Sequence, residues 1–241
     1  VLDAGWPITT PGVTLHRFCG SGQQAVTVAA QSIMAGHQDL VIGGGVESMS
    51  RYAPNHTDGF TANNTHLFEQ YPLIPQGISA DLIATIEGFS REDVDGYAVR
   101  SQERTQASIE AGYFKTGLVP IYHADGRLAL DRDEHPRPGT TMETMVGLNP
   151  SFEKMGKTLY DGQVRTFDDI CKSVYPKINA VNHVHHAGNS SGVVDGASAI
   201  LLASPKYAKA HGLKPRARIV MTATAGTEPV IMLTAPGPAA E

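Results

Sequence analysis

HRFCGSGQQAVTVAAQSIMAGHQDLVIGGG, residues 16–45, is the stretch that decides the fold. Residues 13–18 are predicted to form a short strand. The alanine-rich run after Cys19 has a high helix propensity, and Gly36 is typical of the position just past a helix end. The apolar run at residues 39–45 predicts a buried strand. Strand, helix and strand in this order are typical of a parallel sheet with a crossover helix, so we expect an α/β protein.

Composition and charge exclude several classes of protein. The 241 residues are 41% hydrophobic and 18% charged, which is enough for an apolar core in one or two domains. The net charge is -5 and no basic run occurs, which argues against nucleic-acid binding. No apolar stretch has the length of a membrane span. Two cysteines are too few for a disulfide framework and favour a reducing compartment; Cys171 is interpreted as a small buried apolar side chain.

Cys19 stands where the first predicted strand passes into the helix. Unpaired N–H groups at a helix N-terminus stabilise negative charge and therefore favour the thiolate, which is the nucleophilic form of cysteine. Gly20 and Gly22 lack a Cβ, so a thioester could approach the backbone closely, and the Cys19 amide could donate to an oxyanion. A tight turn with a buried cysteine explains this short stretch equally well.

The same stretch matches the G-x-G-x-x-G/A fingerprint of dinucleotide-binding proteins, from Gly20 to Ala25. Glu47 follows the second strand and could bind a ribose, so a nicotinamide or flavin site is an alternative. Two features argue against a dinucleotide site. His16 and Arg17 make the preceding strand polar, and the three glycines at 43–45 indicate close packing that a dinucleotide site does not require. No Gly-Lys-Ser/Thr follows, which excludes a P-loop.

A histidine cluster precedes a run of small polar residues near the end of the chain. His183, His185 and His186 could bind a metal, but no cysteine or acidic residue stands at a zinc-site spacing, so we predict no metal. Residues 187–192, AGNSSG, would form a narrow wall with hydroxyl and amide groups. Such a wall suits a thin, polar, flexible ligand arm.

The remaining sequence divides into an irregular middle and an ordered end. Residues 50–182 are rich in Pro, Asn, Thr and Gly and contain one strong helix, which begins after Ser90 as N-cap. The helix continues at helical spacing through Val94, Tyr97, Ala98, Ser101 and Thr105. A strand from about residue 197, a short helix at 205–212 and a strand at 217–227 are predicted to follow.

Three segments resemble the thiolase family and occur in the family's order. Residues 16–50 resemble the segment that carries the nucleophile, residues 187–204 the second conserved block, and residues 226–239 the segment leading into the C-terminal half. The resemblance implies the thiolase fold: an α/β protein with α-β-α-β-α layers, mixed five-stranded sheets and an inserted loop domain, here incomplete at both ends.

On this resemblance, the chain divides into three parts by role. Residues 1–50 would end the N-terminal half and carry the nucleophile, residues 51–182 would form the loop domain for coenzyme A binding and oligomer contacts, and residues 183–241 would close the N-terminal half and begin the C-terminal half.

The resemblance also implies roles for single residues. Cys19 would accept the acyl group, Ser191 would touch the pantetheine arm, Arg137 would lie near a nucleotide phosphate, and Thr144 would stand where many relatives have a serine near the adenine. The activity implied is cleavage of a 3-oxoacyl-CoA by coenzyme A, or the reverse Claisen condensation, with coenzyme A and acyl-CoA as substrates and no permanently bound cofactor. Many relatives have a His-Met-Gly segment in the acyl pocket where this chain has Pro75-Gln76-Gly77, which favours a bulkier acyl group than acetoacetyl.

The family's other catalytic elements do not occur in this sequence. They are an Asn-Glu-Ala-Phe segment that orients a water, a Gly-His-Pro histidine that activates the nucleophile, and a second cysteine before a Gly-rich turn; Cys171 has no such turn after it. We therefore expect an internal piece of a longer enzyme that is inactive alone. A coenzyme A-binding relative without chemistry is the main alternative. A homodimer or homotetramer is expected, in the bacterial cytoplasm or, as an alternative, in an organelle, with a role in fatty acid β-oxidation.

Overall fold

The computed structural model describes residues 1–51, 64–159 and 164–241. The elements of the described residues are, in chain order, η1 (Phe18–Gly20), α1 (Ser21–Met34), β1 (Leu40–Ser48), η2 (Met49–Arg51), α2 (Thr65–Gln70), α3 (Gln76–Glu87), α4 (Arg91–Glu110), β2 (Ile121–Tyr122), β3 (Leu128–Leu130), α5 (Met142–Val146), α6 (Glu153–Gly156), α7 (Phe167–Val174), β4 (Asp195–Ala203), α8 (Pro205–Ala210) and α9 (Pro236–Ala240).

The chain forms two compact units, each built from two segments. Unit 1 comprises Val1–His56 and Val193–Ala223, and unit 2 comprises Thr57–Gly192 and Thr224–Glu241. Unit 2 is therefore inserted between the two strands of the sheet of unit 1. The division by role at residues 50 and 182 stays a prediction.

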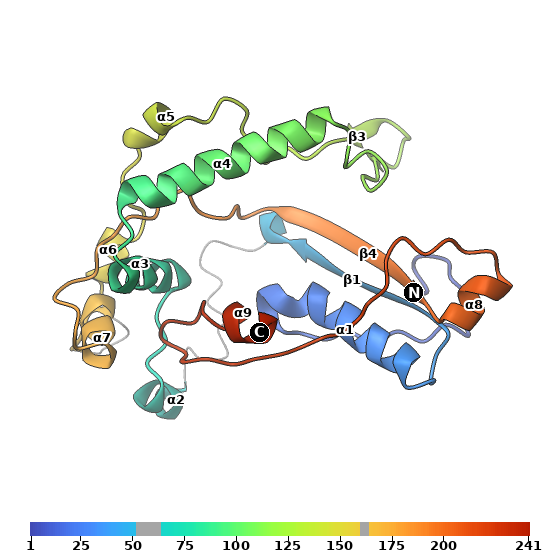
Figure 1. Cartoon of the computed structure of the whole chain (residues 1–241), viewed down its shortest axis with the longest axis horizontal. Helices are drawn as coiled ribbons and strands as arrows, with labels where there is room; N and C mark the ends of the chain where they lie inside the picture. Colours follow the sequence, from blue (N-terminus) through green and yellow to red (C-terminus); the bar gives the residue numbers. More distant parts are fainter. Residues whose placement is uncertain (52–63, 160–163) are drawn as a thin grey trace. The chain divides into compact units, whose positions relative to one another are not determined.

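Unit 1 is built on a strand pair covered by one helix. β1 and β4 pair antiparallel, with a register from Leu40 opposite Ala203 to Ser48 opposite Asp195. Helix α1 packs along β1 (Figure 1). The small buried cluster between them contains Ala29, Ala30 and Leu202, so short side chains on α1 set a close approach to the sheet.

Serine–aspartate pairs fasten both ends of the β1–β4 ladder. At one end, Ser50 donates from its backbone N–H and its hydroxyl to the two oxygens of Asp195, at 2.8 and 2.6 Å. At the other, the Ser204 hydroxyl donates to Asp39 Oδ1 at 2.6 Å, and the Ser204 N–H to the Asp39 carbonyl at 2.8 Å. Because a slip of the register would break both pairs, they reinforce it.

The three glycines of β1 confirm the predicted close packing. A Cβ on Gly43 would lie 2.8 Å from the Cα of Val26 in α1, and one on Gly44 would lie 2.2 Å from the backbone oxygen of Ser198 in β4. A side chain at either position would force backbone apart, since cores have no spare volume there. The glycines therefore allow the helix that follows Cys19 to lie directly on the sheet.

The prediction for residues 16–45 is confirmed for the helix and for the position of the second strand, which is however mostly exposed or half-buried and not buried as expected, and it is wrong for the first strand. Gly36 ends the helix with φ +75°, and the His37 N–H reaches back to the Ser32 carbonyl. Residues 13–17 have no regular structure, and Phe18 has a left-handed φ of 48°, which a strand does not accommodate. The expected parallel pair is replaced by the antiparallel β1–β4 pair, because the partner of β1 comes from the far end of the chain.

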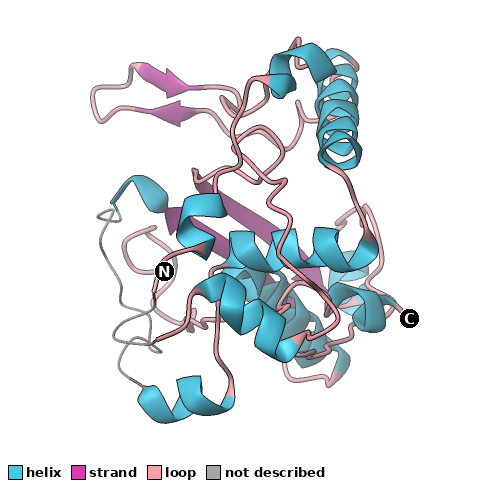
Figure 2. Cartoon of the chain, turned by 90° about the vertical axis from the view of Figure 1, so that its left-hand side faces the viewer, coloured by secondary structure: helices cyan, strands magenta, loops and turns pink. Residues whose placement is uncertain are grey.

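The described residues of unit 2 form short and long helices and one short hairpin. The hairpin consists of β2 and β3 and is drawn in magenta in Figure 2. The main core packs α2, α3 and α7 together with the 224–241 segment. Its buried residues are Phe68, Ile74, Ile78, Leu82, Phe167, Ile170, Cys171, Val181 and Val230. The prediction that Cys171 is a buried apolar side chain is confirmed, and burial raises the pKa of its thiol to about 12.

Helix α4 confirms its predicted cap. Ser90 and Asp93 form a capping box, in which each side chain accepts from the backbone N–H of the other residue. Tyr97 is 68% exposed, and along α4, all of whose residues are described, Asp95 alone is buried. Helix α8 is confirmed from Pro205 onward, whereas the predicted strand at 217–227 has no regular structure.

Candidate active site

Cys19 lies in a tight turn at the start of α1 and is exposed. The turn is η1, and the 14-residue helix α1 follows it directly. Phe18, just before the cysteine, has φ +48°, a conformation that is uncommon for a residue with a side chain and persists only where neighbouring contacts enforce it. The reading of Cys19 as a buried structural cysteine does not fit this exposure.

Ser21 supplies those contacts. Its hydroxyl accepts from the Arg17 N–H at 2.8 Å and donates to the Phe18 carbonyl at 2.7 Å. The Gly20 N–H closes the turn onto the Arg17 carbonyl at 3.0 Å, and the Arg17 guanidinium bonds the amide oxygen of Gln24 one turn further along α1. The Ser21 hydroxyl thus connects the Arg17 N–H to the Phe18 carbonyl, on the residues just before Cys19. These bonds hold the thiol at the N-terminus of α1, where backbone N–H groups lack helical partners.

The dinucleotide alternative does not fit this geometry. The fingerprint works within a strand–helix–strand unit of parallel strands, but residues 13–17 form no strand and β1 runs antiparallel to β4. The carboxylate of Glu47 accepts from the neighbouring Ser48 N–H at 3.1 Å. The glycines after Cys19 therefore serve the turn and the helix packing.

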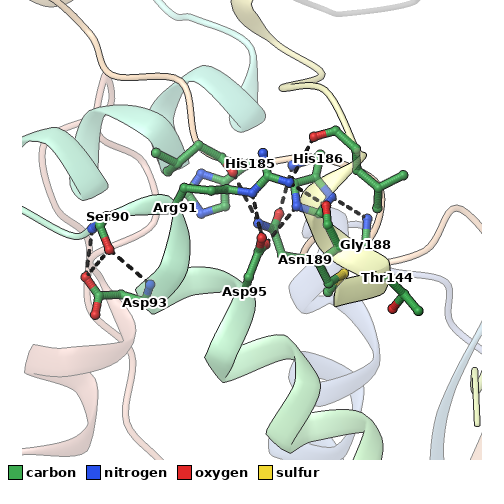
Figure 3. A network of polar contacts seen from close by, with 12 residues as sticks. Ser90, Arg91, Asp93, Asp95, Thr144, His185, His186, Gly188 and Asn189 are labelled. Atoms are coloured by element: carbon green, nitrogen blue, oxygen red, sulfur yellow. Dashed lines mark hydrogen bonds and ion pairs between the residues drawn. The ribbon is translucent and has the colours of Figure 1, made fainter. Parts of the chain in front are cut away.

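In unit 2, a buried carboxylate gathers the segment that leads to Ser191. Asp95 Oδ1 accepts from His186 Nε2 and from Asn189 Nδ2, both at 2.8 Å (Figure 3). His186 Nδ1 accepts from the Gly188 N–H at 3.0 Å, so its proton lies on Nε2. Asn189 Oδ1 accepts from the His186 N–H at 2.8 Å. These bonds fold residues 186–189 into one turn against α4.

Arg91 connects the same carboxylate to α5. Its Nε donates to Asp95 Oδ2 at 2.6 Å, and its Nη2 donates to the carbonyls of Met145 and Leu148 at 2.8 and 2.9 Å. A cation at the C-terminal end of a helix is favourable because the last carbonyls lack partners. Burial acts to raise the pKa of Asp95, but the bonds from Arg91, His186 and Asn189 prevail and lower it.

A second buried carboxylate, Asp81, holds the histidines just before that turn. It accepts from His183 Nδ1 and His185 Nδ1, each at 2.7 Å, and from the backbone N–H groups of Val184 and His185, each at 3.0 Å. Burial acts to raise the pKa of Asp81, but these four bonds outweigh it and lower the pKa to about 2.

The histidine cluster is therefore bound to carboxylates of other elements. His183 also contacts Asp168 of α7, through Nε2 at 3.3 Å. Burial acts to lower the pKa of His183, but the two carboxylates outweigh it and raise the pKa. Within residues 1–51, 64–159 and 164–241, no three His, Cys, Asp or Glu side chains are arranged to hold a metal ion.

Three of the predicted site residues belong to short segments that meet in unit 2. A Cβ on Gly192, next to Ser191, would lie 2.3 Å from Cε1 of His135, which belongs to the loop of Arg137. A Cβ on Gly188 would lie 2.6 Å from the sulfur of Met145, the neighbour of Thr144. The wall at 187–192 thus packs on both other segments.

Each of the three residues also has local contacts or exposure that bear on its role. Ser191 and Arg137 are exposed, and the Arg137 N–H donates to Gln102 of α4 at 2.9 Å. Thr144 caps α5, since its hydroxyl donates to the Thr141 carbonyl at 2.8 Å and accepts from the Thr141 N–H. Cys19, the fourth predicted residue, belongs to unit 1.

Comparison with known proteins identifies the family of this chain. Residues 1–164 match the family described as Thiolase, N-terminal domain. The chain belongs to the thiolase family. It is 37% identical over 257 aligned residues to a beta-ketoadipyl-CoA thiolase of Pseudomonas aeruginosa, covering 99% of this chain and 57% of that protein. It is 34% identical to an acetyl-CoA acetyltransferase of Thiocystis violacea, again over 99% of this chain and 57% of the relative.

Solved thiolases share the fold of this chain. Human mitochondrial 3-ketoacyl-CoA thiolase matches with a TM-score of 0.72 and 31% identity over 99% of this chain and 58% of that one. The same enzyme in complex with CoA matches with a TM-score of 0.71 over 96% of this chain and 54% of that one. The thiolase chain described here thus spans somewhat more than half the length of the curated relatives it matches.

Sequence reasoning missed the buried acids of this site. Asp95 lies in the helix predicted after Ser90 and Asp81 lies in α3, and neither acid has a sequence neighbour that marks it as buried. The histidine cluster was the available signal, because buried imidazoles require hydrogen-bond partners. No described helix of this thiolase is both long and apolar enough to cross a membrane.

Proposed function

We propose that the full-length protein is an acyl-CoA acyltransferase that cleaves a 3-oxoacyl-CoA with coenzyme A, or runs the reverse condensation, through an acyl group on Cys19. In the cleavage direction the Cys19 thiolate forms a thioester with C3 of the substrate while the C2–C3 bond breaks. The electron pair of that bond goes to C2, which is released as acetyl-CoA after protonation. The thiol of coenzyme A then takes the acyl group and the cysteine is regenerated.

The observation that carries this proposal is the exposed thiol in the enforced turn at the N-terminus of α1. A Cys19→Ala variant of the full-length protein should form no acyl-enzyme on incubation with acyl-CoA, as read by intact mass. Cys171→Ala is the matched control, because it removes a buried thiol of the same 241 residues and the variant should still be acylated. Turnover retained by Cys19→Ala would refute the proposal.

We propose Ser191, Arg137 and Thr144 as contacts to coenzyme A, supported by the meeting of their three segments in unit 2. Arg137 is exposed and its guanidinium suits a phosphate group. Arg137→Ala should raise the Kd for coenzyme A by about 10-fold or more, the usual value of a charge-assisted hydrogen bond. An unchanged Kd in Arg137→Ala and Ser191→Ala would remove these assignments without affecting the role of Cys19.

We propose that the acyl group is bulkier than acetoacetyl. An apolar cavity of about 190 Å³ lies beside the Pro75-Gln76-Gly77 segment. Its lining consists of Leu67, Phe68, Tyr71, Leu73, Ile74, Pro75 and Phe167. The beta-ketoadipyl-CoA thiolases among the relatives offer a dicarboxylic substrate as a second candidate, which would place the protein outside fatty acid β-oxidation. A higher kcat/KM for acetoacetyl-CoA than for 3-oxoadipyl-CoA and 3-oxooctanoyl-CoA would contradict this preference.

We further propose a homodimer or homotetramer in the bacterial cytoplasm. The bacterial source of the curated relatives described above supports the setting. Light scattering after size-exclusion chromatography of the full-length protein tests the oligomer, and a monomer at micromolar concentration would contradict it.

A further inference from the structure

The orientation of α4 depends on polar contacts. Along this helix Asp95 alone is buried, so no apolar side chain of α4 is fully enclosed in a core. Helices are usually oriented by an apolar face. Here the buried contact is a carboxylate at 2% exposure, with the His186 imidazole and the Asn189 amide on Oδ1 and the Arg91 guanidinium on Oδ2.

That carboxylate joins three elements. Asp95 itself belongs to α4, its Oδ1 holds the turn at 186–189, and its Oδ2 holds Arg91, which bonds the carbonyls at the end of α5 (Figure 3). Gly188 provides a second link between the turn and α5. It packs so closely against Met145 and Leu148 that a Cβ at position 188 would not fit. The distance between the turn and α5 is therefore fixed by Asp95 as long as it binds the turn through Oδ1 and Arg91 through Oδ2.

We propose that Asp95 is a positioning residue for the coenzyme A site, fixing the turn at 186–189 and α5 to α4 and thereby setting the spacing between Ser191 and Thr144. Arg91 acts with it as the arm that reaches α5. This inference rests on the proposed function, since Ser191 and Thr144 are its assigned coenzyme A contacts. Neither Asp95 nor Arg91 is expected to touch the ligand.

The first measurement follows the turn itself and needs no ligand. Hydrogen exchange of the full-length protein reports the amides of His186, Gly188 and Asn189, which are bonded within the turn. Asp95→Asn places an amide group against Arg91 and removes the charge, so these amides should exchange at least 10-fold faster. Asp93→Asn is the matched control, because it weakens the cap of the same helix and does not touch the turn.

The second measurement is the Kd for coenzyme A by calorimetry, with KM and kcat for thiolysis. Asp95→Asn should raise Kd and KM by about 10-fold or more while kcat changes less, because displacement of binding groups by about 1 Å costs up to 100-fold. Asp93→Asn should lower the melting temperature but leave Kd within about twofold, which separates positioning from a general loss of stability.

A milder variant keeps the inference testable if Asp95→Asn does not fold. Arg91→Lys keeps a positive charge beside Asp95 but cannot bond both carbonyls at the end of α5. The backbone amides of α5 should therefore exchange faster, and the Kd for coenzyme A should increase as it does in Asp95→Asn. The inference would be overturned if Asp95→Asn and Arg91→Lys both showed the same amide exchange rates and the same Kd for coenzyme A as Asp93→Asn. If the unmodified protein does not bind coenzyme A, the proposed function fails together with the positioning role, while the exchange data still show whether Asp95 joins the segments.

Discussion

Replacing Asp81 by asparagine tests the buried network most directly. The carboxylate is completely buried and accepts four hydrogen bonds, two from imidazoles and two from backbone N–H groups. Asparagine has nearly the same shape, but it carries no charge and offers one acceptor oxygen. His183 can keep a bond to the new amide only by moving its proton to Nε2, where Asp168 accepts it.

The size of the effect follows from the pKa of Asp81. A carboxyl whose pKa falls from 3.8 to about 2 on folding stabilises the folded state by about 2 kcal/mol at neutral pH. Because the folded pKa is the lower one, this stabilisation is complete above about pH 4 and is lost as the pH falls through about 2. Asp81→Asn should therefore reduce the free energy of unfolding by about 2–3 kcal/mol at pH 7, and by progressively less between pH 4 and pH 2.5.

His183 adds an opposite dependence at higher pH. Its pKa is raised in the folded state, so its stabilising charge is fully present below its unfolded pKa of 6.5 and is lost as the pH rises through the folded value. The loss caused by Asp81→Asn should thus be larger at pH 5.5 than at pH 8.5, because the charged imidazole then lacks its main counter-charge.

Urea unfolding at pH 8.5, 7, 5.5, 4 and 3 measures these differences. Asp125→Asn is the control: the pKa of Asp125 is also lowered, by bonds to the Arg127 backbone and side chain, but this carboxylate is exposed and should contribute little. A loss below about 1 kcal/mol at pH 7, or a loss that does not change with pH, would refute the reasoning from burial and charge.

Three other expectations concern the turn, the sheet and the thiols. Gly44→Ala should destabilise the protein by about 1–3 kcal/mol or prevent folding, because its Cβ would meet a backbone oxygen of β4, whereas Gly96→Ala on α4 has open space and should raise the melting temperature slightly. Ser21→Ala should slow alkylation of Cys19 by iodoacetamide, since the turn loses its bridging hydroxyl; an unchanged rate would contradict this. Cys171, whose thiol is buried with a pKa of about 12, should resist the same reagent at pH 8 until urea unfolds the protein; early labelling would show that its core opens readily.

Local signals in the sequence are sufficient for the capped helices and for the positions of β1 and β4, but not for the pairing of strands. Ser90, Gly36 and Pro205 each act within a few residues, and the helices they cap or end form as predicted. A strand exists only with a partner, and β1 finds its partner in β4, far along the chain, so neither its antiparallel pairing nor the absence of strands at 13–18 and 217–227 follows from a local pattern.

The candidate site divides in the same way. Cys19 can be recognised from its neighbours in the sequence, because the small residues that follow it at the start of a helix leave room for a substrate beside the thiol. Asp81 and Asp95 act on residues that are 91 to 104 positions away, and no spacing rule connects a carboxylate to such partners. Helix α7 is a different case, because its Thr166–Asp169 capping box is a local signal inside a region whose composition otherwise indicates irregular structure.

The insertion of unit 2 between β1 and β4 has a consequence for the kinetics of folding. Ser50 and Asp195, which fasten one end of the strand pair, are 145 residues apart. Closing a flexible loop of that length costs about 3 kcal/mol more than closing a four-residue hairpin, and topologies with such distant contacts fold slowly. If unit 2 collapses first, the effective loop becomes much shorter. The β1–β4 pair of unit 1 is then completed late, after the inserted unit has already formed, whereas the turn at Cys19 needs only contacts within residues 17–24.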